Sequence, residues 1–219
     1  MHSQAVEDYL KTIYELQSTT GQVGTTSLAE RLNVTPASVT GMIKKLADLK
    51  LVVHEPYQGV RLTKAGLKIA LEVVRHHRLI ETFLAETLGV PWDRVHEDAH
   101  KIEHVLSEEL EDRMDVVLGH PLTDPHGSPI PRRDGTMDEP AQTHLADLSA
   151  GQSAVVAEVS DDDPALLRYL GDLVLYPDTA VTVMAVGPLD GLMTVRVGHK
   201  QHALSHGVAN EVLVAEVRG

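Results

Sequence analysis

Residues 25–50, TTSLAERLNVTPASVTGMIKKLADLK, determine how the first part of the chain folds. Its apolar residues recur at helical spacing in two runs, which are separated by Asn33, Val34, Thr35 and Pro36. Thr35 can cap the second helix, and Pro36 suits the first position of that helix. Residues 51–63, LVVHEPYQGVRLT, predict two short strands around a turn at 56–59. The order helix, tight turn, helix and hairpin is that of a winged helix-turn-helix.

The second helix of this pair has the side chains that reading of DNA needs. A helix that enters the major groove carries small polar residues at its leading end, and basic residues beside it hold phosphates. The alternative is a helical hairpin used only for packing, but the hairpin wing favours DNA binding. The candidate DNA contacts are Ser27, Thr35, Pro36, Ala37, Ser38, Thr40, Lys44, Lys45 and Arg61.

The flanking sequence predicts a chain that is mainly α-helical with a small β domain. Apolar spacing predicts an amphipathic helix over 3–17, a long helix over 64–88 and a further helix from Pro91 to about 118. From residue 151, short Val-rich segments separated by turn residues predict a five-stranded barrel or roll, interrupted by a short helix over 164–170. We therefore expect three domains, at 1–64, 65–148 and 149–219.

Composition limits the classes of function. The net charge of −13 hides an uneven distribution, because residues 1–75 carry +2 and residues 76–148 carry −10. This pattern suits a DNA-binding module joined to a cation-attracting one. The chain has no cysteine, which excludes disulfides, zinc–thiolate sites and cysteine nucleophiles. No signal peptide and no membrane span are visible, so we expect a cytoplasmic protein without a membrane partner.

Residues 96–104, HEDAHKIEH, carry a second pattern. On a helix, His96, His100, Glu103 and His104 lie within about one third of the circumference. Three imidazoles and a carboxylate suit a divalent first-row metal ion. On the preceding helix, His77 and Glu81 lie four residues apart, and such a pair by itself is typical of a solvated surface. Because the linker between the two helices is short, they should run antiparallel, and the two stripes can meet.

The first five of these letters, HEDAH, also match the H-E-x-x-H pattern of zinc proteases. A zinc hydrolase would need this helix in a core, a third ligand downstream and a pocket for a peptide. Here the helix has an acidic outer face and follows a DNA-binding module, so we expect no enzyme. A metal-storage or delivery protein is a further alternative, but it would leave the winged helix without a role. No signature of a pocket for a small organic ligand is visible.

Several stretches together resemble the diphtheria toxin repressor family of metal-dependent bacterial regulators. These are EDYLKTIYEL at 7–16, the helix-turn-helix, RHHRLIETFL at 75–84, RVHEDAHKIEHVLSEELEDRM at 94–114 and DPHGSPIP at 124–131. The resemblance covers nearly the full length, and the C-terminal domain is similar to the SH3-like barrel of the longer members. It implies a homodimeric repressor that binds a palindromic double-stranded DNA operator when metal is bound, and that controls metal-transport genes.

The resemblance also implies two metal sites per subunit. The primary site would use Asp8, His100, Glu103 and His104. The ancillary site would use His77, Glu81 and His96, with an acidic group from the barrel, for which we choose Asp163 among Asp161, Asp162 and Asp163. In manganese-specific relatives the position of His77 instead joins a two-metal cluster, which also wants a carboxylate where this chain has Lys11.

The identity of the metal follows from the ligand types. In the iron-responsive branch a Cys stands at the position of His100 and a Met at that of Asp8, and this chain lacks both sulfur ligands. Oxygen and nitrogen donors favour Mn(II), with Fe(II) as the alternative. His100 also departs from the manganese branch, where the resemblance would imply Glu.

Overall fold

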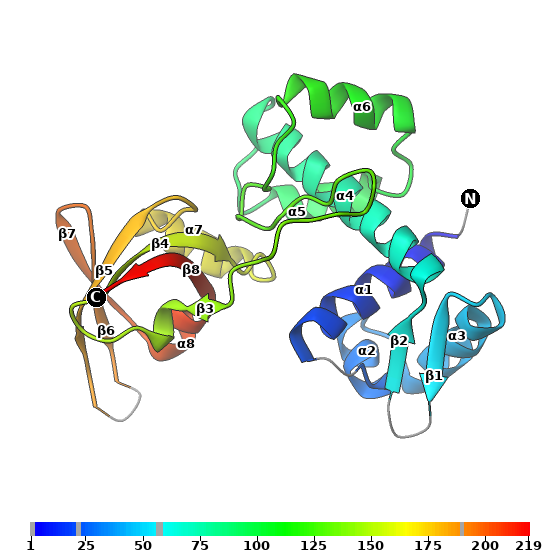
Figure 1. Cartoon of the computed structure of the whole chain (residues 1–219), viewed down its shortest axis with the longest axis horizontal. Helices are drawn as coiled ribbons and strands as arrows, with labels where there is room; N and C mark the ends of the chain where they lie inside the picture. The colour runs from blue at the N-terminus through cyan, green and yellow to red at the C-terminus, as the bar shows by residue number, and fades with distance from the viewer. Residues whose placement is uncertain (1–2, 21–22, 56–58, 189–190) are drawn as a thin grey trace. The chain divides into compact units, whose positions relative to one another are not determined.

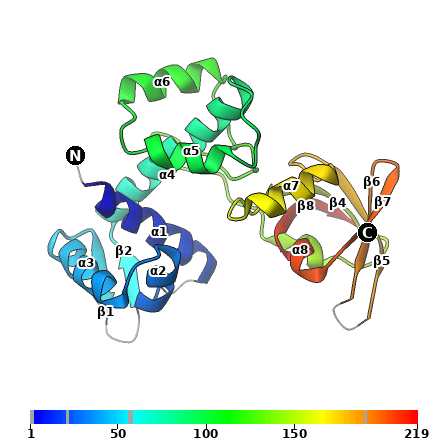
Figure 2. The same ribbon diagram turned by 180° about the vertical axis from the view of Figure 1, so that it is seen from behind.

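The computed structural model describes residues 3–20, 23–55, 59–188 and 191–219, and its chain divides into two compact units (Figures 1 and 2). The first unit contains the residues up to 77 together with 102–107 and 131–136. The second contains residues 78–101, 108–130 and 137–219. Among the described residues, no helix is both long enough and apolar enough to cross a membrane.

The first unit has the predicted helix, turn, helix and hairpin. Its elements are α1 (Gln4–Thr20), α2 (Thr25–Arg31), α3 (Pro36–Asp48), β1 (Val52–Glu55), β2 (Gly59–Leu62) and the first part of α4 (Lys64–Glu86). β1 and β2 are antiparallel, with Val52 opposite Leu62 and Glu55 opposite Gly59. α1 lies against β2, and α3 lies against β1 (Figures 1 and 2). The predicted turn residues 56–58 lie outside the described residues.

Local signals start the reading helix as the sequence predicts. The Thr35 side chain accepts a hydrogen bond from the Ser38 amide at 3.2 Å, and Pro36 is the first residue of α3. The apolar face of α3 enters a core that it shares with α1, α2 and the hairpin. Leu49 is 48% exposed, although its spacing predicts burial, because it lies at the C-cap after the last helical turn.

The helix predicted from Pro91 to about 118 is wrong as a single element. The second unit has α5 (Val95–Ile102) and α6 (Glu108–Val117), and between them residues 103–105 form a turn and residues 106–107 are irregular. Ser107 followed by three glutamates in the next turn is typical of a new helix start, because capping oxygens and negative charge favour a helix N-terminus. Glu103 and His104 therefore lie just beyond the helix on which the spacing placed them.

The C-terminal part of the second unit contains a six-stranded antiparallel sheet, whereas the sequence predicted five strands. The order is β3-β8-β4-β5-β6-β7, and the two-residue β3 and the polar β7 are the strands that Val-rich patterning does not predict. The short predicted helix is confirmed as α7. The elements are β3 (Thr143–His144), η1 (Leu145–Asp147), β4 (Ser153–Val159), α7 (Pro164–Asp172), β5 (Ala180–Val186), β6 (Met193–Val197), β7 (Lys200–Leu204), α8 (His206–Asn210) and β8 (Val212–Arg218).

Candidate metal centre

The residues predicted to contact DNA are all exposed, as such contacts require. Part of their polarity is used locally, because the hydroxyls of Thr35 and Ser38 lie 2.9 Å apart and the Thr40 hydroxyl donates to the Pro36 carbonyl at 2.9 Å. They stay predictions as DNA contacts. The exposed set is Ser27, Thr35, Pro36, Ala37, Ser38, Thr40, Lys44, Lys45 and Arg61.

A first cluster, Glu7, Asp8, Glu103 and His104, joins α1 to the turn after α5 within the first unit. His104 Nδ1 lies 2.7 Å from Glu7 Oε2, and this hydrogen bond assigns the ring proton to Nδ1. His104 Nε2 then faces two carboxylate oxygens, Asp8 Oδ1 at 2.8 Å and Glu103 Oε1 at 3.3 Å. A carboxylate that orients the far nitrogen of an imidazole is the usual outer partner of a metal-binding histidine.

Glu103 is fixed through its other oxygen. Lys11 Nζ donates to Glu103 Oε2 at 2.8 Å, and His77 Nδ1 contacts the same oxygen. The side chains of Lys11 and Glu103 are 10% and 0% exposed, so this ion pair is buried. The predicted ancillary ligand His77 thus contacts the first cluster through Nδ1, and it also precedes Glu81 by one turn on α4.

His100 is the remaining predicted member of the primary site. It is exposed in the last turn of α5 and precedes His104 by four residues. The helix wheel placed four side chains on one helix, but Glu103 and His104 lie in the turn after α5 and belong to the first cluster. His96 lies on α5 and pairs with Glu81 and Asp161. Because α5 ends at Ile102, the chain turns there and directs Glu103 and His104 toward α1.

A second cluster, Glu81, His96 and Asp161, lies in the second unit. His96 Nδ1 is 3.1 Å from Glu81 Oε1 and 3.1 Å from Asp161 Oδ2. The three residues offer ligand atoms within 4.8 Å of one another. The hydrogen bonds to Asp161 and Glu81 raise the pKa of His96 to about 10, because both carboxylates favour the protonated ring. A proton and a metal ion therefore compete for the same nitrogen.

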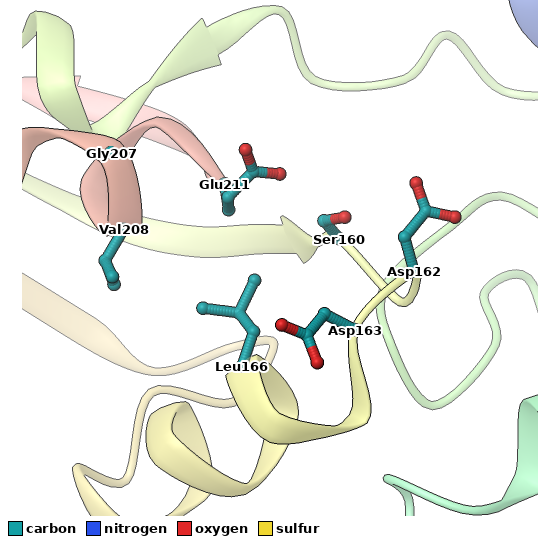
Figure 3. Close-up of a pocket in the computed structure, with 7 residues that line it drawn as sticks. All are labelled: Ser160, Asp162, Asp163, Leu166, Gly207, Val208 and Glu211. Carbon is teal, nitrogen blue, oxygen red and sulfur yellow. The ribbon is translucent and has the colours of Figure 1, made fainter. Parts of the chain in front are cut away.

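Asp161, and not the predicted Asp163, lies beside His96, so Asp163 stays a prediction from sequence and Asp161 is the better placed candidate. Asp161 is the residue beside His96, while Asp163 is the N-cap of α7 and accepts a hydrogen bond from the Ala165 amide at 2.8 Å. Figure 3 shows Asp163 pointing toward Leu166 and a cavity of the barrel that Glu211 also lines. The signal lay in the sequence, because Asp163 precedes Pro164 at the start of the predicted helix, as Thr35 precedes Pro36 at the start of α3.

Asp124 and His126, two buried residues beside the second cluster, were not predicted from the sequence as site residues. Glu81, Asp124 and His126 also offer ligand atoms within 4.8 Å of one another, and all three are buried. Burial and the neighbouring Glu81 carboxylate raise the pKa of Asp124 to about 7. His126 Nε2 lies 2.8 Å from the Trp92 carbonyl, which assigns its proton to Nε2. His126 Nδ1 is buried and makes no hydrogen bond to any described residue.

Asp124 and His126 belong to the segment DPHGSPIP at 124–131, and the fold of this segment buries both of them. A buried loop of this composition was the sequence signal that could have pointed to them. Asp124 Oδ1 accepts hydrogen bonds from the amides of His126 at 2.8 Å and Ser128 at 3.0 Å, so the loop folds around this carboxylate. Gly127 has a φ of +94°, and a Cβ there would meet the Ala157 carbonyl oxygen at 2.0 Å. The loop thus requires glycine, and it buries the histidine before it.

Both clusters fit a divalent cation. In the first, three acceptor atoms converge, and Asp8 Oδ1 is buried without a hydrogen bond to any described residue. With the His104 proton on Nδ1, each of the three atoms offers a lone pair, so a divalent ion among them would bind all three. Carboxylate oxygens and imidazole nitrogens without sulfur form a donor set for Mn(II), Fe(II) or Zn(II).

The protease pattern has no counterpart in this geometry. Glu97, the residue that would act as general base, has a side chain 83% exposed and pairs with Lys101 at 2.9 Å. His96 lies in the second cluster, and it pairs with residues outside the motif. A winged helix combined with carboxylate and imidazole clusters defines a metal-responsive DNA-binding regulator, and not a hydrolase.

Comparison with known proteins gives the family. Residues 1–60 match the family model described as iron dependent repressor, N-terminal DNA binding domain, and residues 63–132 match its metal binding and dimerisation domain. Residues 143–216 match the FeoA domain. The chain is 33% identical to the iron-dependent repressor IdeR of Mycobacterium tuberculosis over 96% of each chain. It therefore belongs to the iron-dependent, or diphtheria toxin, repressor family, as the sequence motifs predicted.

Solved structures agree on the fold and name other metals. A manganese-dependent transcriptional repressor in complex with manganese is 38% identical, with a TM-score of 0.89 over 95% of this chain and 98% of that one. ScaR with bound Cd²⁺ is 30% identical, with a TM-score of 0.82 over 96% and 98%. The fold class of winged helix, helical metal and dimerisation part and SH3-like domain is confirmed, and the chain is a metal-dependent DNA-binding repressor that forms a homodimer, not an enzyme.

Proposed function

We propose that this chain is a Mn(II)-activated transcriptional repressor, with Fe(II) as the alternative metal. One observation carries the proposal: Asp8 on α1 and the pair Glu103 and His104 present three converging acceptor atoms from two separate segments. Because α1 shares its apolar core with the reading helix α3, an ion held there acts on the DNA-binding module. A repressor works where the chromosome is, so we place it in the cytoplasm.

We propose two metal sites per subunit. The first would use Asp8, Glu103 and His104, and His100 would join from the preceding turn. The second would use Glu81, His96 and Asp161, with His77 one turn before Glu81 and the buried Nδ1 of His126 as further donors. Their support is the donor chemistry and the distances within each unit.

The protein's own residues prepare the first site. Glu7 holds the His104 ring so that Nε2 offers its lone pair, and Lys11 with His77 holds one Glu103 oxygen so that the other faces Asp8 and His104. A bound divalent ion supplies the positive charge that these acceptors share. Ligands that are oriented in advance lose less entropy on binding, so the site needs little rearrangement.

The regulatory consequence is a change in how the homodimer presents its two reading helices. We propose that metal fixes the first helix of each subunit and so favours the spacing at which both reading helices enter successive major grooves of a palindromic operator. Linkage requires that DNA tighten metal binding by the factor by which metal tightens DNA binding.

We further propose that the chain has three domains, at 1–64, 65–148 and 149–219. We also propose that the repressor controls metal-transport genes.

The preference for Mn(II) rests on the ligands. The candidate donors are oxygen and nitrogen atoms, and the chain has no cysteine. Such donors suit Mn(II) better than thiolate sites do, although affinity for a given site rises from Mn(II) to Fe(II). The manganese complex named among the similar structures supports the same choice.

The test begins with selection of operator sequences from a random duplex pool in the presence of Mn(II). Binding of the selected duplex is then measured with Mn(II), with Fe(II) without oxygen and with a chelator, while bound metal is counted. Asp8→Asn should lose the metal response, and Asp172→Asn, an exposed aspartate on α7, should keep it. DNA binding that is equally tight with chelator and with metal would refute the proposal.

A further inference from the structure

A permanent cation already links the two segments that a metal ion would link. Lys11 lies on α1 three residues after Asp8, and its Nζ donates to Glu103 Oε2 at 2.8 Å. Glu103 belongs to the turn after α5, and its side chain has no exposed surface. The Lys11–Glu103 pair therefore crosses from α1 to residues 102–107 beside the first cluster, without any metal.

The pair is placed to hold Glu103, because both of its partners are buried. Lys11 is 8% exposed and His77 is 3% exposed, and both contact the same carboxylate oxygen. A buried charge that loses its partner is strongly unfavourable, so separating α1 from residues 102–107 would strand an ammonium in a dry site. The apolar residues Val6 and Leu10 bind α1 into the DNA-binding module, so this link extends to the whole module.

We propose that Lys11 is a metal-independent link between the DNA-binding module and residues 102–107, and that it sets the basal state on which metal acts. In the metal-free protein the Lys11–Glu103 pair keeps α1 in place and keeps Glu103 oriented toward His104. Metal then adds a second link through Asp8 and does not create the only one. The role given to the ion rests on the proposed function, whereas the link through Lys11 does not.

Hydrogen–deuterium exchange of the peptide that covers residues 102–107 tests this division of roles. With chelator present, Lys11→Gln should make this peptide exchange about tenfold faster or more, because one buried charge loses its partner. Asp8→Asn should lose the added protection that Mn(II) gives, and in chelator its exchange should rise far less than that of Lys11→Gln. Lys68→Gln, an exposed lysine on α4, is the matched control and should behave as wild type.

The outcomes separate the two claims. Unchanged exchange in metal-free Lys11→Gln overturns the inference, even if Mn(II) protects the wild type. If Lys11→Gln exchanges fast but Mn(II) does not protect the wild type, the Lys11 link is supported and the proposed metal site is refuted. If Lys11→Gln does not fold by circular dichroism, Glu103→Gln removes the same ion pair from the other side and must give the same fast exchange. Lys11→Arg keeps the charge and should remain protected.

Discussion

Removal of the Glu103 carboxylate should destabilise the metal-free protein, an effect separate from any loss of metal. Glu103→Ala takes away the carboxylate between Lys11 and His77 and leaves the Lys11 ammonium, 8% exposed, without its counter-ion. Removing one partner of a buried pair costs about 3–5 kcal/mol. Asp8→Ala removes a carboxylate that is 25% exposed and that faces other acceptor atoms in the absence of metal, so this variant should lose much less stability.

Urea unfolding in the presence of chelator measures this difference. Far-ultraviolet circular dichroism follows the helices of both units, and fluorescence of the single tryptophan, Trp92, follows the second unit alone. Glu103→Ala should shift the first signal to lower urea and leave the second nearly unmoved. The double variant Lys11→Met with Glu103→Leu replaces both charges by apolar groups and should recover most of the loss, because neither charge is stranded.

A Glu103→Ala variant as stable as Asp8→Ala in chelator would exclude a stabilising Lys11–Glu103 pair. A double variant whose loss equals the sum of the two single losses would exclude it as well, since partners in one ion pair must couple. Either result would mean that the Lys11–Glu103 contact contributes nothing to the metal-free fold. It would then leave Glu103 as a metal ligand alone.

Three further predictions concern the second cluster. Asp161→Asn should lower the Mn(II) affinity of this cluster, measured by calorimetry, and Asp163→Asn should not. The reverse result would show that Asp163, the residue predicted from sequence, is the ligand. Because Trp92 stacks on His126 with ring centroids 5.8 Å apart, Mn(II) should change tryptophan fluorescence, and His126→Ala should abolish that change; a response kept in that variant would exclude His126 as a ligand. The carboxylates beside His96 raise its pKa to about 10, so the stabilisation from this pairing is complete below pH 6.5 and is lost as the pH rises through 10. Thermal denaturation in chelator should show that loss of stability in wild type. The His96→Gln variant should not show it.

The winged helix could be read from sequence because its signals are local. Thr35 followed by Pro36 starts α3, and the spacing of Val39, Ile43 and Leu46 fixes its buried face. The break between α5 and α6 was missed because His104 fits the helical stripe as well as the turn that it occupies. In that turn the long-range contact with Glu7 outweighs the local preference for helix.

The metal clusters were only partly predictable, for a related reason. Spacing within one helix finds pairs such as His77 and Glu81, but it cannot show which partner comes from another segment. Lys11 reaches Glu103 across 92 positions of sequence, and Asp161 reaches His96 across 65. These contacts depend on how elements pack, and packing is not encoded in the period of any one helix.

Whether metal at the first site controls DNA binding is best measured by a Mn(II) titration of operator binding by wild type and Asp8→Asn, with bound metal determined in the same samples. Wild-type DNA affinity should rise as Mn(II) fills the first site. Asp8→Asn should bind about one ion fewer per subunit and should no longer respond. An Asp8→Asn variant that kept both the full metal content and the full rise in DNA affinity would show that metal at Asp8 does not control DNA binding.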